Sequence, residues 1–267
     1  MCPGTCRYTQ LEWSIAMAEF TGAASSAARY TKEEWQVRVD LAAMHRLAHD
    51  YGYDDIVWNH ITARVPGGGH NFLMNHFGLH NTEITASNLI KIDQDGNVLD
   101  GPPDVNTAGF VIHKGIHNSI PNAKFVFHSH APAALAATAI EEVVHLVQDS
   151  SMLYGKISYH DWEGLSVDLD ESQRLADNLG NNKCMIMRNH GFLTVGETAG
   201  ECFINMYYLV RACQTMLQAY STGLPLVKTS PVLWEKACKQ YESFPAGKYE
   251  WPAMLRLLDK KDPSYRY

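Results

Sequence analysis

Two short apolar segments that each run into histidine constrain the fold of this chain more than any other feature. Lys124-Phe125-Val126-Phe127 leads into His128-Ser129-His130, and Cys184-Met185-Ile186-Met187 leads into Arg188-Asn189-His190-Gly191. On a strand, side chains two residues apart point to the same face, so His128 and His130 project together. With His190 at a neighbouring strand end, three nitrogens form a facial set that suits a divalent metal with an open position. The sequence therefore predicts a sheet whose strand ends carry a metal site made by His128, His130 and His190.

Composition and charge narrow the class of protein. With 267 residues, the chain is long enough for one large α/β domain or two small ones. A net charge of −7 argues against nucleic acid or an anionic membrane as partner, and no segment approaches the roughly 18 apolar residues of a membrane span. Six cysteines, of which only Cys2 and Cys6 are closely spaced, favour unpaired thiols and a cytoplasmic location. A small-molecule substrate is the partner we expect.

Hydrophobic periodicity and turn residues divide the chain into three parts. Residues 1–29 are interpreted as a flexible leader, residues 30–222 as one α/β domain and residues 223–267 as a helical extension. The domain opens with a helix whose first residues, Thr31 and Glu34, predict a capping box. Other predicted helices cover 106–120, 131–140, 170–178, 197–220, 232–241 and 251–258; other predicted strands cover 56–65, 72–74, 90–92, 98–99, 157–159 and 192–195.

Several motifs, in order and with compatible spacing, resemble the class II aldolase/adducin family. They are Val105-Asn106…Gly109-Phe110-Val111-Ile112-His113, Pro121-Asn122-Ala123-Lys124, His128-Ser129-His130, Tyr159-His160-Asp161 and Arg188-Asn189-His190-Gly191. The resemblance covers about Thr31 to Gln218, and Tyr249-Glu250-Trp251-Pro252 is similar to adducin-like members. It implies a three-layer α/β/α sandwich with a central, mainly antiparallel sheet. It also implies Zn²⁺ bound by the three histidines and assembly as a homotetramer.

The chain departs from the sugar-phosphate aldolases of this family at positions that carry their chemistry. Those enzymes have an acid/base glutamate nineteen residues before the first metal-binding histidine, where this chain has Gly109. Their two phosphate-binding serines correspond to Thr107-Ala108, and the glycine of their phosphate loop corresponds to Asn88 in Thr85-Ala86-Ser87-Asn88. Since phosphate needs converging N–H and hydroxyl donors, we expect a non-phosphorylated substrate. The residues expected to bind it are Asn59, Thr85, Ser87 and Thr107.

Two residues are candidates for the missing proton carrier. His76, like the nearby His80, occupies a position where adducin-like members usually have other residue types, and an imidazole titrates near neutral pH. Tyr159 could donate a proton to a substrate oxygen. For His76, His80 and Tyr159, a surface or structural role is the alternative, and for His113 a structural hydrogen bond is the favoured interpretation.

Together, the resemblance and the departures predict a metal-dependent lyase-type enzyme that is not a standard sugar-phosphate aldolase. The ion, Zn²⁺ or alternatively Fe²⁺ or Mn²⁺, would hold two substrate oxygens and stabilise an enediolate. That chemistry serves retro-aldol cleavage, decarboxylation and epimerisation. One alternative is an Fe²⁺ oxygenase of the same fold, since three imidazoles also suit iron. Another is a non-enzymatic, adducin-like interaction module, which the lack of a long basic tail disfavours.

Overall fold

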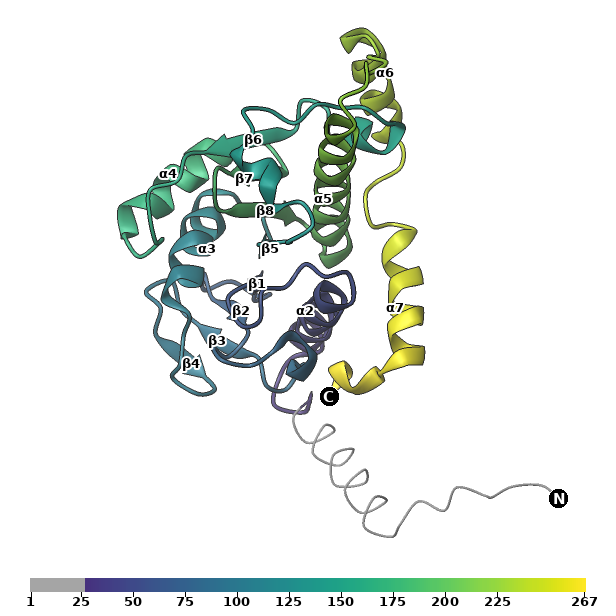
Figure 1. Ribbon diagram of the computed structural model, residues 1–267. Coiled ribbons are helices and arrows are strands. Elements are labelled where there is room, and N and C mark those ends of the chain that lie inside the picture. The colour runs from purple at the N-terminus through teal and green to yellow at the C-terminus, as the bar shows by residue number, and fades with distance from the viewer. Residues whose placement is uncertain (1–26) are drawn as a thin grey trace, which may run out of the picture.

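An eight-stranded sheet forms the centre of the molecule (Figure 1). The structure, a computed structural model, describes residues 27–267, so nearly all of the expected leader, including Cys2 and Cys6, lies outside the described residues. The strands are β1 (His60–Arg64), β2 (Phe72–Met74), β3 (Ile90–Ile92), β4 (Val98–Asp100), β5 (Phe125–Ser129), β6 (Ile157–His160), β7 (Cys184–Met187) and β8 (Gly191–Gly196). They lie in the order β4-β3-β2-β1-β5-β8-β7-β6. Within residues 27–267 only β6 and β7 pair in parallel, which confirms the mainly antiparallel sheet.

Helices cover both faces of this sheet. They are α2 (Lys32–Asp50), α3 (Thr107–Ser119), α4 (Leu169–Leu179), α5 (Ala199–Ser221), α6 (Pro231–Tyr241) and α7 (Glu250–Lys261), with short 3₁₀ helices η1 (Asn81–Glu83), η2 (Leu135–Ala139), η3 (Gln148–Leu153) and η4 (Pro263–Arg266). On one face, Ile116 of α3 and Leu175 of α4 share a core with Val126 of β5. On the other face, α2 and α5 share a larger core with Phe127, the next residue of the same strand. The predicted three-layer α/β/α arrangement is thereby confirmed (Figure 1).

The carboxyl-terminal helices follow α5 along the chain. Helix α7 packs against α2 and α5 (Figure 1), and the backbone carbonyls of Tyr265 and Tyr267 accept hydrogen bonds from the N–H groups of Ala86 and Ser87. Dividing the chain at residue 223 stays a prediction. No helix in residues 27–267 is long and apolar enough to cross a membrane.

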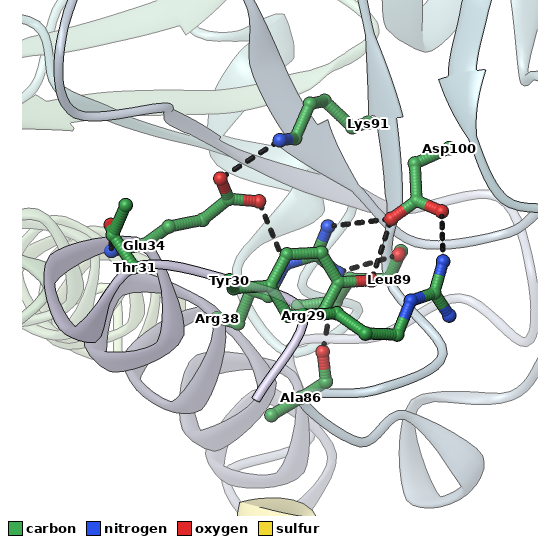
Figure 2. Close-up of polar contacts among 9 residues, drawn as sticks. All are labelled: Arg29, Tyr30, Thr31, Glu34, Arg38, Ala86, Leu89, Lys91 and Asp100. Atoms are coloured by element: carbon green, nitrogen blue, oxygen red, sulfur yellow. Dashed lines mark hydrogen bonds and ion pairs between the residues drawn. The ribbon is translucent and has the colours of Figure 1, made fainter. Parts of the chain in front are cut away.

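Helix α2 begins with half of the predicted capping box. Thr31 Oγ1 accepts a hydrogen bond from the Glu34 N–H at 3.1 Å. The Glu34 carboxylate does not return the interaction; it accepts instead from Arg38 Nε at 3.1 Å and Lys91 Nζ at 2.8 Å (Figure 2). The reciprocal box was therefore a wrong prediction, because a buried cation competes for the carboxylate more strongly than a neutral backbone N–H does.

The buried cation that Glu34 binds ties α2 to the β3–β4 hairpin. Arg38 is completely buried and donates to the Leu89 carbonyl at 2.9 Å and to Asp100 at 3.3 Å. The Tyr30 ring lies over its guanidinium at 3.9 Å and its hydroxyl donates to Asp100 at 2.6 Å (Figure 2). A charge this deep is tolerated only when its donors are satisfied, and so this cluster fixes the helix on the sheet edge.

Two predicted elements near the histidines differ from the structure. The strand expected from residue 56 begins at His60, because Ile56 adopts a φ of 51° and the Trp58 N–H closes a turn onto the Asp55 carbonyl. The helix expected at 131–140 is reduced to η2, and the Thr138 carbonyl accepts from the Asn189 N–H at 3.1 Å. The second segment is thereby bound to the β7–β8 turn that carries His190.

Candidate metal centre

The three histidines predicted as metal ligands lie together at the end of β5, beside the β7–β8 turn. His128 is in β5, His130 follows the strand and His190 lies in the turn. One ring nitrogen of each lies within 4.8 Å of the others. The shared face of the first two follows from strand alternation, since Val126, two residues earlier, packs on the same side against α3 and α4.

The turn that carries the third histidine approaches β5 closely. Asn189 adopts a φ of 55°, a left-handed conformation that asparagine accepts at low cost. A Cβ on Gly191 would lie 2.6 Å from the Ser129 carbonyl oxygen and 3.0 Å from the His130 ring. Only glycine lets the turn come this near, which explains the Asn-His-Gly order of the motif.

The hydrogen bonds of His128 and His130 leave one nitrogen of each directed at the other. The Nδ1 of His128 donates to the Phe192 carbonyl at 3.0 Å, and the Nδ1 of His130 donates to Asp55 Oδ2 at 2.9 Å. Their Nε2 atoms are 3.0 Å apart. Because each neutral ring carries its proton on Nδ1, each Nε2 atom has a lone pair. Two lone pairs at this distance repel each other unless a cation lies between them. Zn²⁺ binds imidazole nitrogen at about 2.0–2.1 Å, so these residues fit a metal ion.

Electrostatics favour the neutral, metal-binding forms. Burial, together with the neighbouring imidazoles, holds the pKa of His128 well below its usual value. Burial and the neighbouring histidines likewise lower the pKa of His190 to about 4. Both rings therefore offer lone pairs near neutral pH.

Asp55 is a residue of this cluster that the sequence analysis missed. A carboxylate on the far nitrogen of a ligating histidine fixes its tautomer and orientation and raises its basicity. Asp55 occupies this place for His130, held there by the loop between α2 and β1. A lone aspartate in a loop gives no periodic signal, so only the fold reveals it.

His60 fills the space beside Gly109. It pairs with His128 across the antiparallel β1–β5 ladder, and their rings stack with centroids 4.9 Å apart. A Cβ at position 109 would lie 2.7 Å from His60 Cδ2. A side chain at position 109 would therefore meet the imidazole of His60, which comes from β1.

A chain of hydrogen bonds assigns the protons of His60. The Ala123 carbonyl can only accept, so His117 Nδ1 carries a proton and donates to it at 3.0 Å. Burial lowers the pKa of His117 to about 3, so its Nε2 is an acceptor, and the Thr62 hydroxyl donates a hydrogen bond to it at 2.7 Å. The Thr62 oxygen then accepts from His113 Nδ1 at 2.6 Å, and the Nε2 of this neutral histidine accepts from His60 Nδ1 at 3.0 Å.

The other nitrogen of His60 is consequently a hydrogen-bond acceptor. Burial lowers the pKa of His60 to about 3, with further contributions from the charges of neighbouring histidines, so the ring is neutral and Nε2 has a free lone pair. His113, expected to play a structural role, is the link that orients it. The sequence spacing of these residues shows none of this, since they come from β1 and α3.

A cavity of about 350 Å³ opens beside the three histidines. His60, His128, His130 and His190 all line it, and Trp58 and Trp162 are among its other lining residues. The cavity combines a cluster of nitrogen ligands with large apolar surfaces, which is the usual character of a small-molecule site.

The residues predicted to bind substrate lie in several places, and none is among the lining residues of this cavity within the described chain. Asn59 is buried, and its amide nitrogen and oxygen have no partner among the described residues. Thr107 is the first residue of α3. Thr85 and Ser87 hydrogen-bond to each other at 3.2 Å. Their role as substrate ligands stays a prediction.

The two candidate proton carriers are engaged elsewhere. His76 pairs with Asp104 at 3.2 Å. The Tyr159 hydroxyl accepts from the Val143 N–H at 2.9 Å, and burial raises its pKa. Neither lines the cavity in the described part of the chain, so their catalytic role also stays a prediction.

Comparison with known proteins gives a consistent result. Residues 39–217 match the model of the class II aldolase and adducin N-terminal domain. A putative aldolase class 2 protein of Caulobacter vibrioides is 40% identical over 242 residues, which are 89% of this chain and 94% of that protein. Rat alpha-adducin is 35% identical over 88% of this chain, but the match spans only 34% of the adducin.

A solved structure supports the fold. The L-fuculose 1-phosphate aldolase from Glaciozyma antarctica PI12 superposes with a TM-score of 0.79 at 27% identity, covering 92% of this chain and 99% of that one.

Proposed function

This chain belongs to the class II aldolase and adducin family, and from that premise we propose that it is a metal-dependent lyase acting on a small, non-phosphorylated carbonyl or hydroxy acid compound. The reaction is retro-aldol cleavage, decarboxylation or epimerisation. One observation carries the proposal: the Nε2 atoms of His128 and His130 face each other at 3.0 Å with their Nδ1 protons committed elsewhere.

The metal ligands in this proposal are His128, His130 and His190, with Zn²⁺ as the first choice and Fe²⁺ or Mn²⁺ as alternatives. When bound, such an ion supplies Lewis-acid polarisation of a substrate oxygen. Asp55 keeps the His130 ring in the tautomer that offers Nε2. The Phe192 carbonyl does the same for His128.

His60 acts on the substrate as a fixed acceptor. Its Nε2 lone pair can accept a hydrogen bond from a substrate hydroxyl. The hydrogen-bond chain through His113 keeps the His60 proton on Nδ1, so Nε2 cannot act as a donor. In this proposal a hydroxyl next to the reacting carbonyl points at His60, in the space where related enzymes have a glutamate.

The surroundings of the Thr85–Asn88 loop support a substrate without phosphate. Phosphate binding uses backbone N–H groups, and the N–H groups of Ala86 and Ser87 already donate to the carbonyls of Tyr265 and Tyr267 at 2.9 and 2.8 Å. The large apolar faces of Trp58 and Trp162 at the cavity favour an apolar group on the substrate instead.

The proposal is tested by metal analysis and proton exchange. Protein purified without chelator should contain one divalent ion that is lost in His128→Ala and His190→Ala. NMR in D₂O should show exchange of the proton next to the carbonyl for a hydroxy acid or hydroxy ketone, and the exchange should vanish in the same variants. A metal-free wild type, or efficient cleavage of L-fuculose 1-phosphate with no reaction of unphosphorylated compounds, would contradict it.

The likeness to alpha-adducin favours one other candidate, a non-enzymatic interaction module. Metal-dependent substrate turnover separates the two, since a module predicts none. Oxygen uptake by the Fe²⁺-loaded protein would instead indicate an oxygenase. A cytoplasmic homotetramer completes the proposal, and light scattering at micromolar concentration tests the assembly.

A further inference from the structure

A second group of metal-ligand side chains lies on the surface outside the cavity. His49 is in the last turn of α2, Asp54 lies in the loop that follows, and His80 precedes η1. Their ligand atoms all lie within 4.8 Å of one another. Asp54 Oδ2 is 2.7 Å from His49 Nδ1 and 3.6 Å from His80 Nε2, and the two imidazole rings meet edge to face at 4.9 Å.

The carboxylate of this group has an unusual set of partners. The Asp54 side chain is only 14% exposed. Within residues 27–267 its ion-pair partners are His49 and His80, and no lysine or arginine approaches it. A largely buried carboxylate normally has a permanent cation beside it. The imidazoles of His49 and His80 are neutral when they bind a metal ion, so they supply ligand nitrogens but do not balance the negative charge of Asp54.

The residues that follow His80 hold the orientation of its ring. Its Nδ1 accepts from the Thr82 N–H at 3.3 Å and lies 2.8 Å from Thr82 Oγ1, so Nε2 carries the proton of the neutral ring and faces Asp54. The backbone N–H of His80 is held in turn by Glu83 at 2.8 Å. An ion bound by Nε2 would displace this proton to Nδ1, which would then donate to Thr82 Oγ1 in place of accepting from the Thr82 N–H.

We propose that His49, Asp54 and His80 form a second metal site, separate from the three histidines of the cavity, that binds a divalent transition-metal ion such as Zn²⁺. Two imidazole nitrogens and one carboxylate oxygen are typical zinc ligands, and solvent completes the coordination on the exposed side. The two histidines come from different elements of the fold, so the ion would join the end of α2 to the segment before η1.

The site is connected to the cavity through a single loop. Asp54 precedes Asp55, whose carboxylate orients His130 at 2.9 Å, and the Tyr53 carbonyl accepts from the Ser129 hydroxyl at 2.6 Å. An ion on Asp54 would therefore hold the same three-residue segment that supports the inner histidines. We expect it to stabilise this loop against local opening.

The experiment measures Zn²⁺ binding by equilibrium dialysis and metal analysis in a His128→Ala/His190→Ala background, which disables the inner site. Circular dichroism confirms that each variant is folded. The background variant should still bind one Zn²⁺ and gain thermal stability from it. Adding either His49→Ala or His80→Ala should abolish both effects, and Asp54→Asn should weaken the binding.

His70→Asn is the matched control, because His70 is an exposed histidine with a φ of 51° that asparagine also accepts. It should leave Zn²⁺ binding unchanged. The proposal is overturned if the folded background variant binds no Zn²⁺, or if its binding survives in His49→Ala and His80→Ala.

The same measurements separate this proposal from the proposed function. A wild-type protein that binds one ion, lost in His80→Ala but kept in His190→Ala, would refute the inner site and support the outer one. The reverse pattern would support the inner site alone.

Discussion

Replacing Gly109 by alanine tests how tightly His60 is held beside the proposed metal ligands. The new methyl group would lie 2.7 Å from Cδ2 and 2.8 Å from Cγ of the His60 ring. Because ordinary contact begins at 3.4 Å, the ring would have to retreat by roughly 0.7 Å. It has little room to do so, since it stacks on His128 and its Nδ1 donates to His113 at 3.0 Å.

Two effects of opposite sign determine the stability of Gly109→Ala. Alanine in a helix is favoured over glycine by about 1 kcal/mol. Overpacking of a buried site costs about 1–3 kcal/mol. We therefore expect the free energy of unfolding to fall by up to about 2 kcal/mol. We also expect weaker Zn²⁺ binding, because the displaced ring presses on His128.

A double-mutant cycle with His60→Ala isolates the contact. Urea unfolding in chelator gives the stability of the metal-free protein, and competition with a chromophoric chelator gives the Zn²⁺ affinity. In the His60→Ala background the clash is gone, so Gly109→Ala should stabilise the protein by about 1 kcal/mol. If Gly109→Ala stabilises the wild type by this same amount and leaves Zn²⁺ affinity unchanged, the ring has free space and the reasoning is wrong.

Three further results are expected. Asp55→Asn should lower Zn²⁺ affinity about 10- to 100-fold, because the amide is a poorer acceptor for the His130 Nδ1 proton; unchanged affinity in chelator competition would exclude this support. Burial lowers the pKa of His60 and His117 to about 3. Between pH 6.5 and about pH 3 the unfolded state therefore binds more protons than the folded state does. The contribution of these two histidines to the free energy of unfolding is complete above pH 6.5. Below that pH, the free energy of unfolding of the metal-free protein should fall by about 1.4 kcal/mol per pH unit for each histidine. A free energy of unfolding, measured in urea, that does not change from pH 6.5 to 4.5 would contradict this. Arg38→Met should cost about 1.5–3 kcal/mol, because Glu34 and Asp100 lose a buried charged donor and keep only Lys91 and Tyr30 beside them. A loss below about 1 kcal/mol in the same assay would show that the cluster in Figure 2 is not a strong anchor.

The sequence predicted the parts of the site that depend on local rules. Strand alternation places His128 and His130 on one face, and the Asn-His-Gly turn places His190 at a strand end. The same period, together with helix caps and turn residues, predicted most helices and strands. These features need only neighbours a few residues away, which a single sequence displays.

The remaining parts depend on contacts between distant segments. His60 faces His128 only because β1 and β5 are adjacent in a particular register, and periodicity does not report strand order. The segment expected as a helix at 131–140 instead binds the β7–β8 turn, a contact that outweighs its helical propensity. The Glu34 carboxylate binds Arg38 and not the Thr31 N–H for a similar reason, since folding decides which cation lies beside it.

The histidine chain that ends at the Ala123 carbonyl has a direction, and that direction is set by the main chain. A backbone oxygen has no proton to give, so no side-chain replacement at position 123 can reverse the donors and acceptors that lead to His60. The direction of donation can be changed only by interrupting the chain of hydrogen bonds. Thr62 is the residue at which to interrupt it, because its single hydroxyl joins two imidazoles. Valine at position 62 would release His113 from its assigned tautomer. The cavity would then be free to recognise a substrate carbonyl where it now recognises a hydroxyl, so one buried methyl-for-hydroxyl exchange would alter ligand preference without touching any residue that lines the cavity.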